Sequence, residues 1–149
     1  MALDIYSGLN VTRNVNQTLS GTTVNVTALI DRQGYEALSV LLSTATVTDA
    51  GAASGFTMKL QHSDTTVATD FVDCASTEVF GNTTLTVTAD TDDNKDIGLI
   101  GYRGSKRYVR AVITGTTGTD ASCIVRFFRG IPSSASQPVT TIGSTTAST

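Results

Sequence analysis

The sequence predicts an all-β protein, an antiparallel β-sandwich of jelly-roll type with about eight strands. Three observations support this prediction: a β-favouring composition, polar and apolar residues that alternate, and regularly spaced turn residues. Among 149 residues there are 27 Thr, 13 Gly, 2 Pro and no Trp, and stiff, β-branched threonine suits pleated strands. The length favours a single domain, and turns every 8–12 residues are typical of sandwiches and barrels.

Alternation with period 2 defines the strands of the first half, because successive side chains of a strand point to opposite faces. Clusters such as Asp31-Arg32-Gln33-Gly34 separate the runs, as turn residues do. We expect no helix, only a short turn near 70–78. In chain order, the side chains expected to face the core are Val24, Val26, Ala28 and Ile30, then Leu38, Val40 and Leu42, then Phe56, Met58, Leu60 and His62, then Leu85, Val87 and Ala89.

Two strands of the second half alternate in the same way. Residues 106–114 place Lys106, Tyr108, Arg110 and Val112 on one face, with Val109, Ala111 and Ile113 on the other. Residues 122–129 place Cys123, Val125, Phe127 and Arg129 opposite Ile124, Arg126 and Phe128. If these two strands pair, Arg110 and Arg126 lie near each other.

The two ends of the chain differ from its middle. Residues 133–149 are small, polar and uncharged, so they bury too little apolar area to offset their ordering entropy. Residues 1–20 are also polar, with scattered apolar side chains. The predicted organisation is an N-terminal arm at 1–20, a sandwich at 21–132 and a flexible tail at 133–149.

Cys74 and Cys123 are the two cysteines of the chain. The first residues lack the basic and apolar regions of a signal peptide, and no apolar run has the length of a membrane span. These features predict synthesis in a reducing cytoplasm with two free thiols. A disulfide between them, formed after release from the cell, is the alternative.

Catalytic chemistry finds little support in the residues. His62 is the one histidine, and its place on an inward face predicts a structural imidazole. Glu36 and Glu78 are the two glutamates, and the sequence does not pair them as a glycosidase requires. With no nucleophile elbow, phosphate-binding loop or dinucleotide fingerprint, we expect a protein that is no enzyme and has no cofactor.

The acidic turn at 90–96 is the one segment with metal-like spacing. Asp90, Asp92, Asn94 and Asp96 follow the 1, 3, 5, 7 pattern of a calcium loop. Lys95 stands where that loop needs glycine, and no glutamate occupies its last position. We therefore expect a solvated acidic turn and no metal site, with a cation site completed by distant residues as the alternative.

Basic residues gather at 98–115, which we expect to form a β-hairpin. Residues 1–100 have a net charge of −8, whereas residues 101–149 have a net charge of +5. A solvated face that balances the acidic turns is one interpretation, and a patch for a protein partner or a second copy is the other. Nucleic-acid binding is disfavoured by the overall charge of −3.

Two stretches resemble a group of small β-sandwich proteins encoded among the structural genes of tailed bacteriophages. These stretches are "FTMKLQHSDTT" and, about forty residues later, "IGYRGSKRYVRAVITGTTGTDAS". The resemblance covers about residues 54–130 and implies a capsid cement (decoration) protein or another virion component, without catalytic residues.

We therefore expect the chain to bind the major capsid protein on the outer face of the assembled head and to stabilise the head by bridging subunits. Shell symmetry suggests a homotrimer, with neither nucleic acid nor membrane as a partner. A head-fibre base, a tail or connector protein and a carbohydrate-binding jelly roll are the alternatives. The contact residues we expect are Tyr6, Leu9, Arg103, Lys106, Arg107, Tyr108 and Arg110.

Overall fold

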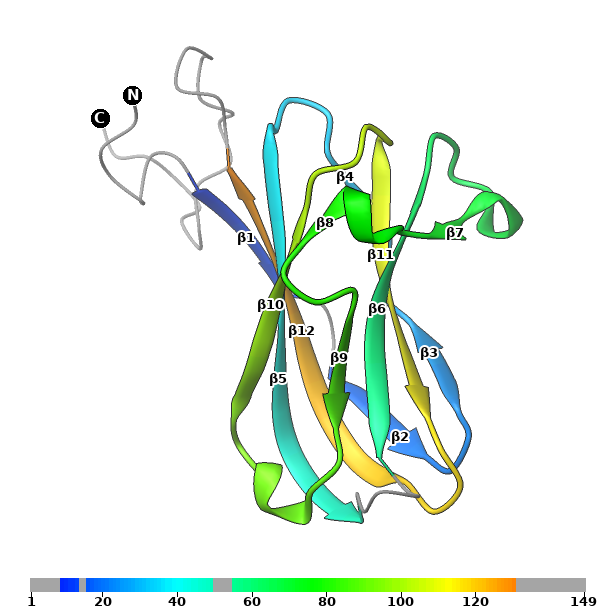
Figure 1. Ribbon diagram of the computed structural model, residues 1–149, viewed down its shortest axis with the longest axis vertical. Helices are drawn as coiled ribbons and strands as arrows, with labels where there is room; N and C mark the ends of the chain where they lie inside the picture. Colours follow the sequence, from blue (N-terminus) through cyan, green and yellow to red (C-terminus); the bar gives the residue numbers. More distant parts are fainter. Residues whose placement is uncertain (1–8, 14–15, 50–54, 131–149) are drawn as a thin grey trace.

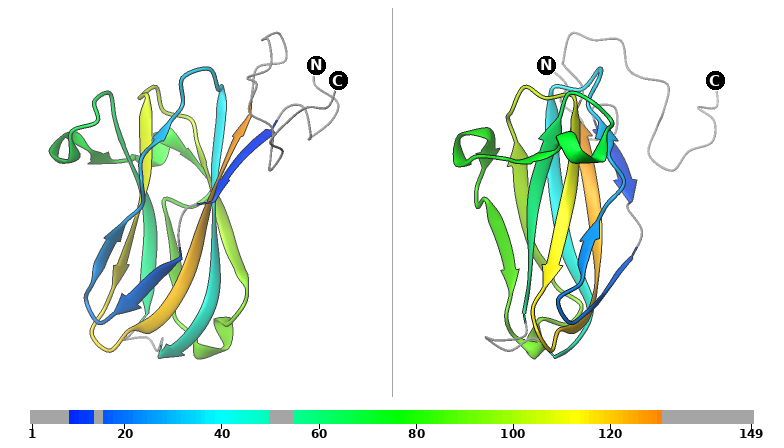
Figure 2. Two further views of the ribbon diagram at one scale, coloured as in Figure 1. Left: turned by 180° about the vertical axis from the view of Figure 1, so that it is seen from behind. Right: turned by 90° about the vertical axis from the view of Figure 1, so that its right-hand side faces the viewer.

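The computed structural model describes residues 9–13, 16–49 and 55–130 (Figure 1). Within these residues the chain forms two six-stranded antiparallel sheets that pack against each other as two layers (Figure 2). Short 3₁₀ turns are the only helical elements in this part of the chain, at Ala68–Asp70, Ser76–Glu78 and Asp90–Asp92. The predicted β-sandwich is confirmed, and two of the turns lie where a short turn was expected.

Sheet A has the strand order β1-β12-β5-β10-β8, with β2 also paired to β12. Its strands are β1 (Leu9–Arg13), β2 (Gln17–Ser20), β5 (Ala37–Asp49), β8 (Val79–Phe80), β10 (Asp96–Tyr102) and β12 (Asp120–Gly130).

Sheet B has the order β3-β11-β6-β7, with β4 paired to β11 and β9 paired to β6. Its strands are β3 (Val24–Val26), β4 (Ile30–Asp31), β6 (Phe56–Ser63), β7 (Val72–Asp73), β9 (Thr84–Val87) and β11 (Tyr108–Gly115). The chain passes repeatedly from one sheet to the other, which supports the jelly-roll assignment; that assignment stays a prediction.

The core lies between the sheets and contains most of the residues that alternation assigned to it, the exceptions being Val24, Val26, Ala28 and Ala89. In β12, Cys123, Val125 and Phe127 are fully buried, while Ile124, Arg126 and Phe128 face outward. The inward-facing side chains of β6 are also buried, from Phe56 to the imidazole of His62. Apolar burial of this kind is the main stabilising term of a small domain.

Part of the predicted N-terminal arm belongs to the sandwich. β1 and β2 both pair with β12, and Leu19 is fully buried in the core. The scattered apolar residues of this segment therefore belong to two edge strands of sheet A. Residues 1–8 and 131–149, which include the rest of the predicted arm and the whole predicted tail, lie outside the described residues.

The predicted inward face of the strand at 24–30 is wrong except at Ile30, since Ala28 is exposed as well. Val24 and Val26 are 56% and 44% exposed, whereas Thr27 is buried. The strand is interrupted between β3 and β4, and this interruption changes the alternation. The hydroxyl of Thr27 accepts a hydrogen bond from the backbone N–H of Ala111 at 2.9 Å, so a polar side chain can occupy the buried position.

The hairpin expected at 98–115 is also wrong. β10 lies in sheet A and β11 lies in sheet B, so the turn between them crosses from one sheet to the other. β11 and β12 also lie in different sheets, and therefore Arg110 and Arg126 are not cross-strand neighbours. Arg110 is opposite Gln61 of β6, and Arg126 is opposite Leu41 of β5.

Candidate functional site

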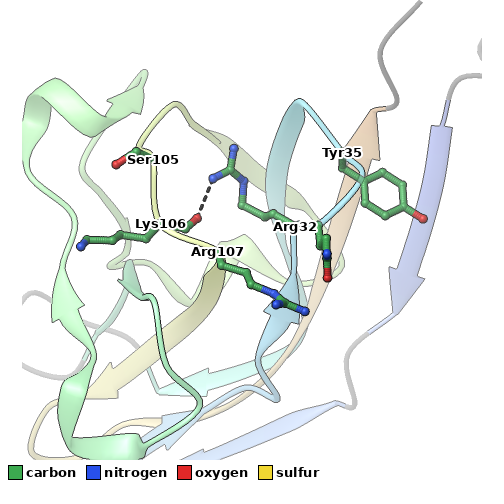
Figure 3. A pocket seen from close by; sticks show the side chains of 6 residues that line it. Arg32, Tyr35, Ser105, Lys106 and Arg107 are labelled. Atoms are coloured by element: carbon green, nitrogen blue, oxygen red, sulfur yellow. Dashed lines mark hydrogen bonds between the residues drawn. The ribbon is translucent and has the colours of Figure 1, made fainter. Parts of the chain in front are cut away.

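A pocket of about 250 Å³ opens at one end of the sandwich (Figure 3). We call this the pocket end. The loop after β4 and the loop between β10 and β11 form its walls. Its lining is basic and polar, and consists of Arg32, Gln33, Tyr35, Ser105, Lys106 and Arg107.

Arg32 joins the two walls of the pocket. Its Nη1 donates to the backbone carbonyls of Gly104 at 3.1 Å and Lys106 at 2.7 Å, the second of which is drawn in Figure 3. The guanidinium also stacks over the ring of Tyr102, 4.6 Å from its centroid. A guanidinium group can both donate to carbonyls and stack on an aromatic ring, because it is planar and permanently charged. Its buried Nε has no hydrogen-bond partner among the described residues.

Tyr102 is buried, and it holds the loop between β10 and β11 in place. Its hydroxyl accepts a hydrogen bond from the backbone N–H of Lys106 at 3.1 Å and lies 2.7 Å from Nδ1 of His62. A Cβ atom at position 104 would lie 2.4 Å from the same hydroxyl. Glycine at 104 therefore lets the loop close around the tyrosine. Burial raises the pKa of Tyr102 to about 12, so the hydroxyl keeps its proton.

His62 connects the two sheets beneath the pocket. Because the Tyr102 hydroxyl already accepts from Lys106, its own proton is free to donate to Nδ1 of His62. The second nitrogen, Nε2, faces Glu78 Oε2 at 3.5 Å. The imidazole is buried, and its contacts are those of the structural residue that the sequence predicted.

Two ion pairs form the rim of the pocket. Arg107 binds Asp31 with two contacts, Nε to Oδ1 at 2.9 Å and Nη2 to Oδ2 at 2.7 Å. The Nζ of Lys106 lies 2.6 Å from Asp64 Oδ2. Hydrogen bonds from Arg107 and Lys106 lower the pKa of Asp31 and Asp64 respectively. Exposed pairs of this kind contribute little to stability, so they can exchange partners.

Arg129 of β12 ties strand β1 to the pocket end. Its Nη1 donates to the carbonyl of Asp31 at 3.1 Å, and its Nη2 donates to side-chain oxygens of Asn10 and Thr12. The guanidinium stacks over Tyr35 at 4.4 Å. The loop after β4 is therefore fixed to the edge of sheet A.

The predicted contact residues fall on three surfaces. Lys106 and Arg107 line the pocket. Arg103 lies at the edge of sheet A, where its Nε donates to the Thr77 carbonyl at 2.6 Å and its guanidinium stacks over Phe80. Arg110 lies on the outer face of sheet B.

The contacts of Arg110 are with Gln61 at 2.8 and 3.0 Å and with the ring of Phe71. Tyr108 is half-buried beneath the guanidinium of Arg107. Leu9 is half-buried at the start of β1, opposite Gly130. Tyr6 lies outside the described residues.

The two stretches that carry the bacteriophage resemblance contact each other. Gln61 binds Arg110, His62 binds Tyr102, and Asp64 binds Lys106. The second stretch thus folds around the end of the first, over about forty residues of separation. Much of the motif is explained by these internal contacts, which place Lys106 and Arg107 at the rim.

Sequence reasoning missed half of the pocket. Arg32 and Gln33 were predicted only as turn residues, Tyr35 was given no role, and Arg129 was placed only on one face of a strand. One feature of the sequence could have indicated these residues: an arginine, Arg32, lies in the turn at 31–34. Arginine is enriched at binding surfaces. The approach of these residues to residues 105–107 depends on the pairing of β4 with β11, which the sequence did not show.

The acidic turn at 90–96 is bonded to strand β5. Asp93 accepts from the Val47 backbone N–H, Ser43 donates to Asp96 at 2.5 Å, and Lys95 lies 3.2 Å from Asp92. No group of three or more His, Cys, Asp or Glu in 9–13, 16–49 and 55–130 is placed to hold a metal ion.

The cysteines are not joined. Cys74 is half-buried and Cys123 is buried, and both are free, as predicted. Desolvation raises the pKa of each thiol to about 12, so neither is a reactive thiolate at neutral pH. Within the part of the chain that the structure describes, no helix has the length and apolar character needed to cross a membrane.

No protein-family model matches the chain, and no curated protein is significantly similar to it in sequence.

Proposed function

We propose that the chain is a capsid cement protein of a tailed bacteriophage, which binds the outer face of the assembled head through its pocket end. The proposal rests on one observation. The two stretches that resemble the bacteriophage proteins come together in the fold and form one basic surface, which buried or half-buried side chains hold in place. Arg32 and Tyr102 support that surface, and Lys106 and Arg107 lie at its rim.

The chemistry of the rim suits a carboxylate-bearing protein surface. Arg107 and Lys106 already bind carboxylates of their own chain, and in both pairs the side chains are roughly 40–60% exposed. A carboxylate of the major capsid protein can replace Asp31 or Asp64 at small cost, because an exposed ion pair contributes little to stability. Arginine and tyrosine are also the residues most enriched at interface hot spots.

Stabilisation of the head follows from mass action. A protein that binds only the assembled shell shifts the equilibrium toward that shell. The proposal includes self-association as a homotrimer at threefold positions of the shell, contacts by Tyr6 and Leu9, and synthesis in the host cytoplasm. It assigns no reaction, cofactor, nucleic acid or membrane to the chain.

Copy number in purified particles tests this function. Quantitative mass spectrometry against the major capsid protein should give about one copy, or one trimer, per few capsid subunits. A ratio of a few per cent would place the chain in the tail, the connector or a head fibre. Absence from the particles would overturn the virion proposal altogether.

A further inference from the structure

The outer face of sheet A has an apolar surface, of which Phe80 is in contact with a described charged side chain, the guanidinium of Arg103. Its two most exposed members are Phe80, at 60%, and Leu99, at 55%. Leu41, Phe128 and Val11 are half-buried on the same face. Exposed apolar surface that continues across several strands marks a contact site in a soluble protein.

Strand register places these side chains side by side. One row across the sheet runs Phe80, Gly101, Ser39, Phe128 and Val11, from β8 to β1. In the next row Leu99 of β10 is opposite Leu41 of β5. Phe80 lies close over Gly101, since a Cβ atom at position 101 would be 3.1 Å from the Cβ of Phe80. The apolar side chains are thus spread over the width of the sheet, with Gly101 and Ser39 between the aromatic residues of the first row and with Arg126 next to Leu41 in the second.

The eight residues that precede Leu9 are attached at a corner of this surface. Leu9 begins β1 and Gly130 ends β12, and these two residues are partners. Segment 1–8 has the sequence MALDIYSG, in which Met1, Leu3 and Ile5 alternate with Ala2, Asp4 and Tyr6. Such alternation gives an extended segment one apolar and one polar face. Residues 131–149 begin at the same corner but have only Ile131, Val139 and Ile142 as large apolar residues.

The length of segment 1–8 matches the surface. Eight extended residues span roughly 26 Å at about 3.3 Å each. The four strand spacings from β1 to β8 span roughly 19 Å at about 4.8 Å each. Gly8 and Ser7 form a turn-favouring pair next to Leu9, so the chain can change direction there. Attachment to the same chain also gives the segment a high effective concentration at this face.

We propose that segment 1–8 lies across the outer face of sheet A of its own chain, with Met1, Leu3 and Ile5 against Phe80, Leu99, Leu41 and Phe128. The polar face of the segment then points outward and presents Tyr6 to a partner. In the free protein the segment shields the apolar face, while the pocket end stays accessible. This inference is independent of the proposed function, because it concerns the isolated protein.

Disulfide trapping tests the proposal with a matched control. The variant Leu3→Cys with Leu99→Cys is compared with Leu3→Cys with Val72→Cys, since Val72 is similarly exposed, at 57%, but lies in sheet B. A third variant, Ile142→Cys with Leu99→Cys, probes the segment after β12. Cys74 and Cys123 are poor thiolates, and the single-cysteine variants measure any background from them. All the positions changed are surface positions or lie outside the described residues.

Mild oxidation followed by intact-mass measurement gives the result. We expect the Leu3 and Leu99 pair to form a disulfide within monomers at least about tenfold faster than the Leu3 and Val72 pair. Equal rates would overturn the proposal. Cross-linking found only in dimers would assign the face to a second copy, and faster trapping by the Ile142 pair would assign it to the later segment; either result also overturns the proposal.

Discussion

The two ends of the sandwich both bear charged loops, but they are built differently. At the pocket end, arginine side chains stack on buried or half-buried tyrosines and bind backbone carbonyls. The opposite end we call the acidic end, because its carboxylates gather around the second half of β5. There, Asp93 and Asp96 bind strand β5 directly. The members of the acidic end are Asp49, Asp90, Asp92, Asp93, Asp96 and Asp120.

This difference shows that charged residues at the two ends of one fold can have different roles. At the acidic end the carboxylates of the turn serve the structure, since they accept hydrogen bonds from the strand they cover. At the pocket end the structural work is done by Arg32 and Tyr102 beneath the surface. Lys106 and Arg107 therefore remain on the rim with exposed partners of their own chain, and this is the end that we propose as the binding surface.

The largest effect on stability should come from the buried support of the pocket end. Tyr102→Phe keeps the ring under Arg32 but removes the hydroxyl that serves Lys106 and His62. Two polar groups lose their partner, and we expect unfolding free energy to fall by about 2 kcal/mol. Urea denaturation measures the change. Tyr108→Phe is the control and should change stability by less than about 0.5 kcal/mol; equal losses in both variants would contradict the role given to Tyr102.

A smaller loss should follow a change at the acidic end. Asp93→Ala removes the acceptor of the Val47 backbone N–H, and we expect a loss of about 1 kcal/mol in the same measurement. Asp93→Asn keeps an acceptor oxygen and should recover at least half of that loss. If the alanine and asparagine variants were equally destabilised, charge at the turn, and not the hydrogen bond, would explain the effect.

The smallest effect concerns the pH dependence of the rim. The Arg107 contacts lower the pKa of Asp31 below its ordinary value of 3.8. A lowered folded-state pKa means that the pair stabilises the fold above about pH 4, and that this contribution is lost as the pH falls through the folded value.

Asp31→Asn should therefore reduce the acid sensitivity of stability. Because the pair is partly exposed, we expect the difference between pH 5 and pH 2 to shrink by only a few tenths of a kcal/mol. Urea denaturation at both pH values measures it. An unchanged pH dependence would show that the pair is not formed in solution.

The sequence predicted the sandwich well where strands are long and regular. In β6 the alternation correctly assigned Phe56, Met58, Leu60 and His62 to the core, because one slip would expose a whole apolar set, although Ser63 at the end of the strand is also buried. In β12 it correctly placed Cys123, Val125 and Phe127 on one face. It failed at β3, where Thr27 is buried and Val24 and Val26 are exposed. A three-residue strand gives too short a pattern, and a break in the strand reverses its faces.

The candidate site was predicted only in part because its two walls come from distant segments. Lys106 and Arg107 stood out by local charge, whereas Arg32 and Arg129 join them through pairings across roughly 70 to 100 residues. Arg103 and Arg110 were grouped with them by sequence proximity. The turn between β10 and β11 changes sheets, which sends those two side chains to different faces.

The central claim is that the pocket end binds the shell, and one binding measurement tests it most directly. Lys106→Glu with Arg107→Glu is compared with Lys59→Glu. Lys59 also forms an exposed pair, with Asp73, and its side chain is 39% exposed against 41% for Lys106. Each protein is added to particles stripped of the chain, and bound copies are counted after sedimentation. We expect the double variant to bind at least about tenfold more weakly, since two lost interfacial contacts of about 1 kcal/mol each exceed that factor, while Lys59→Glu binds like the unchanged protein. Equal binding by the double variant, with its fold intact by circular dichroism, would contradict the account.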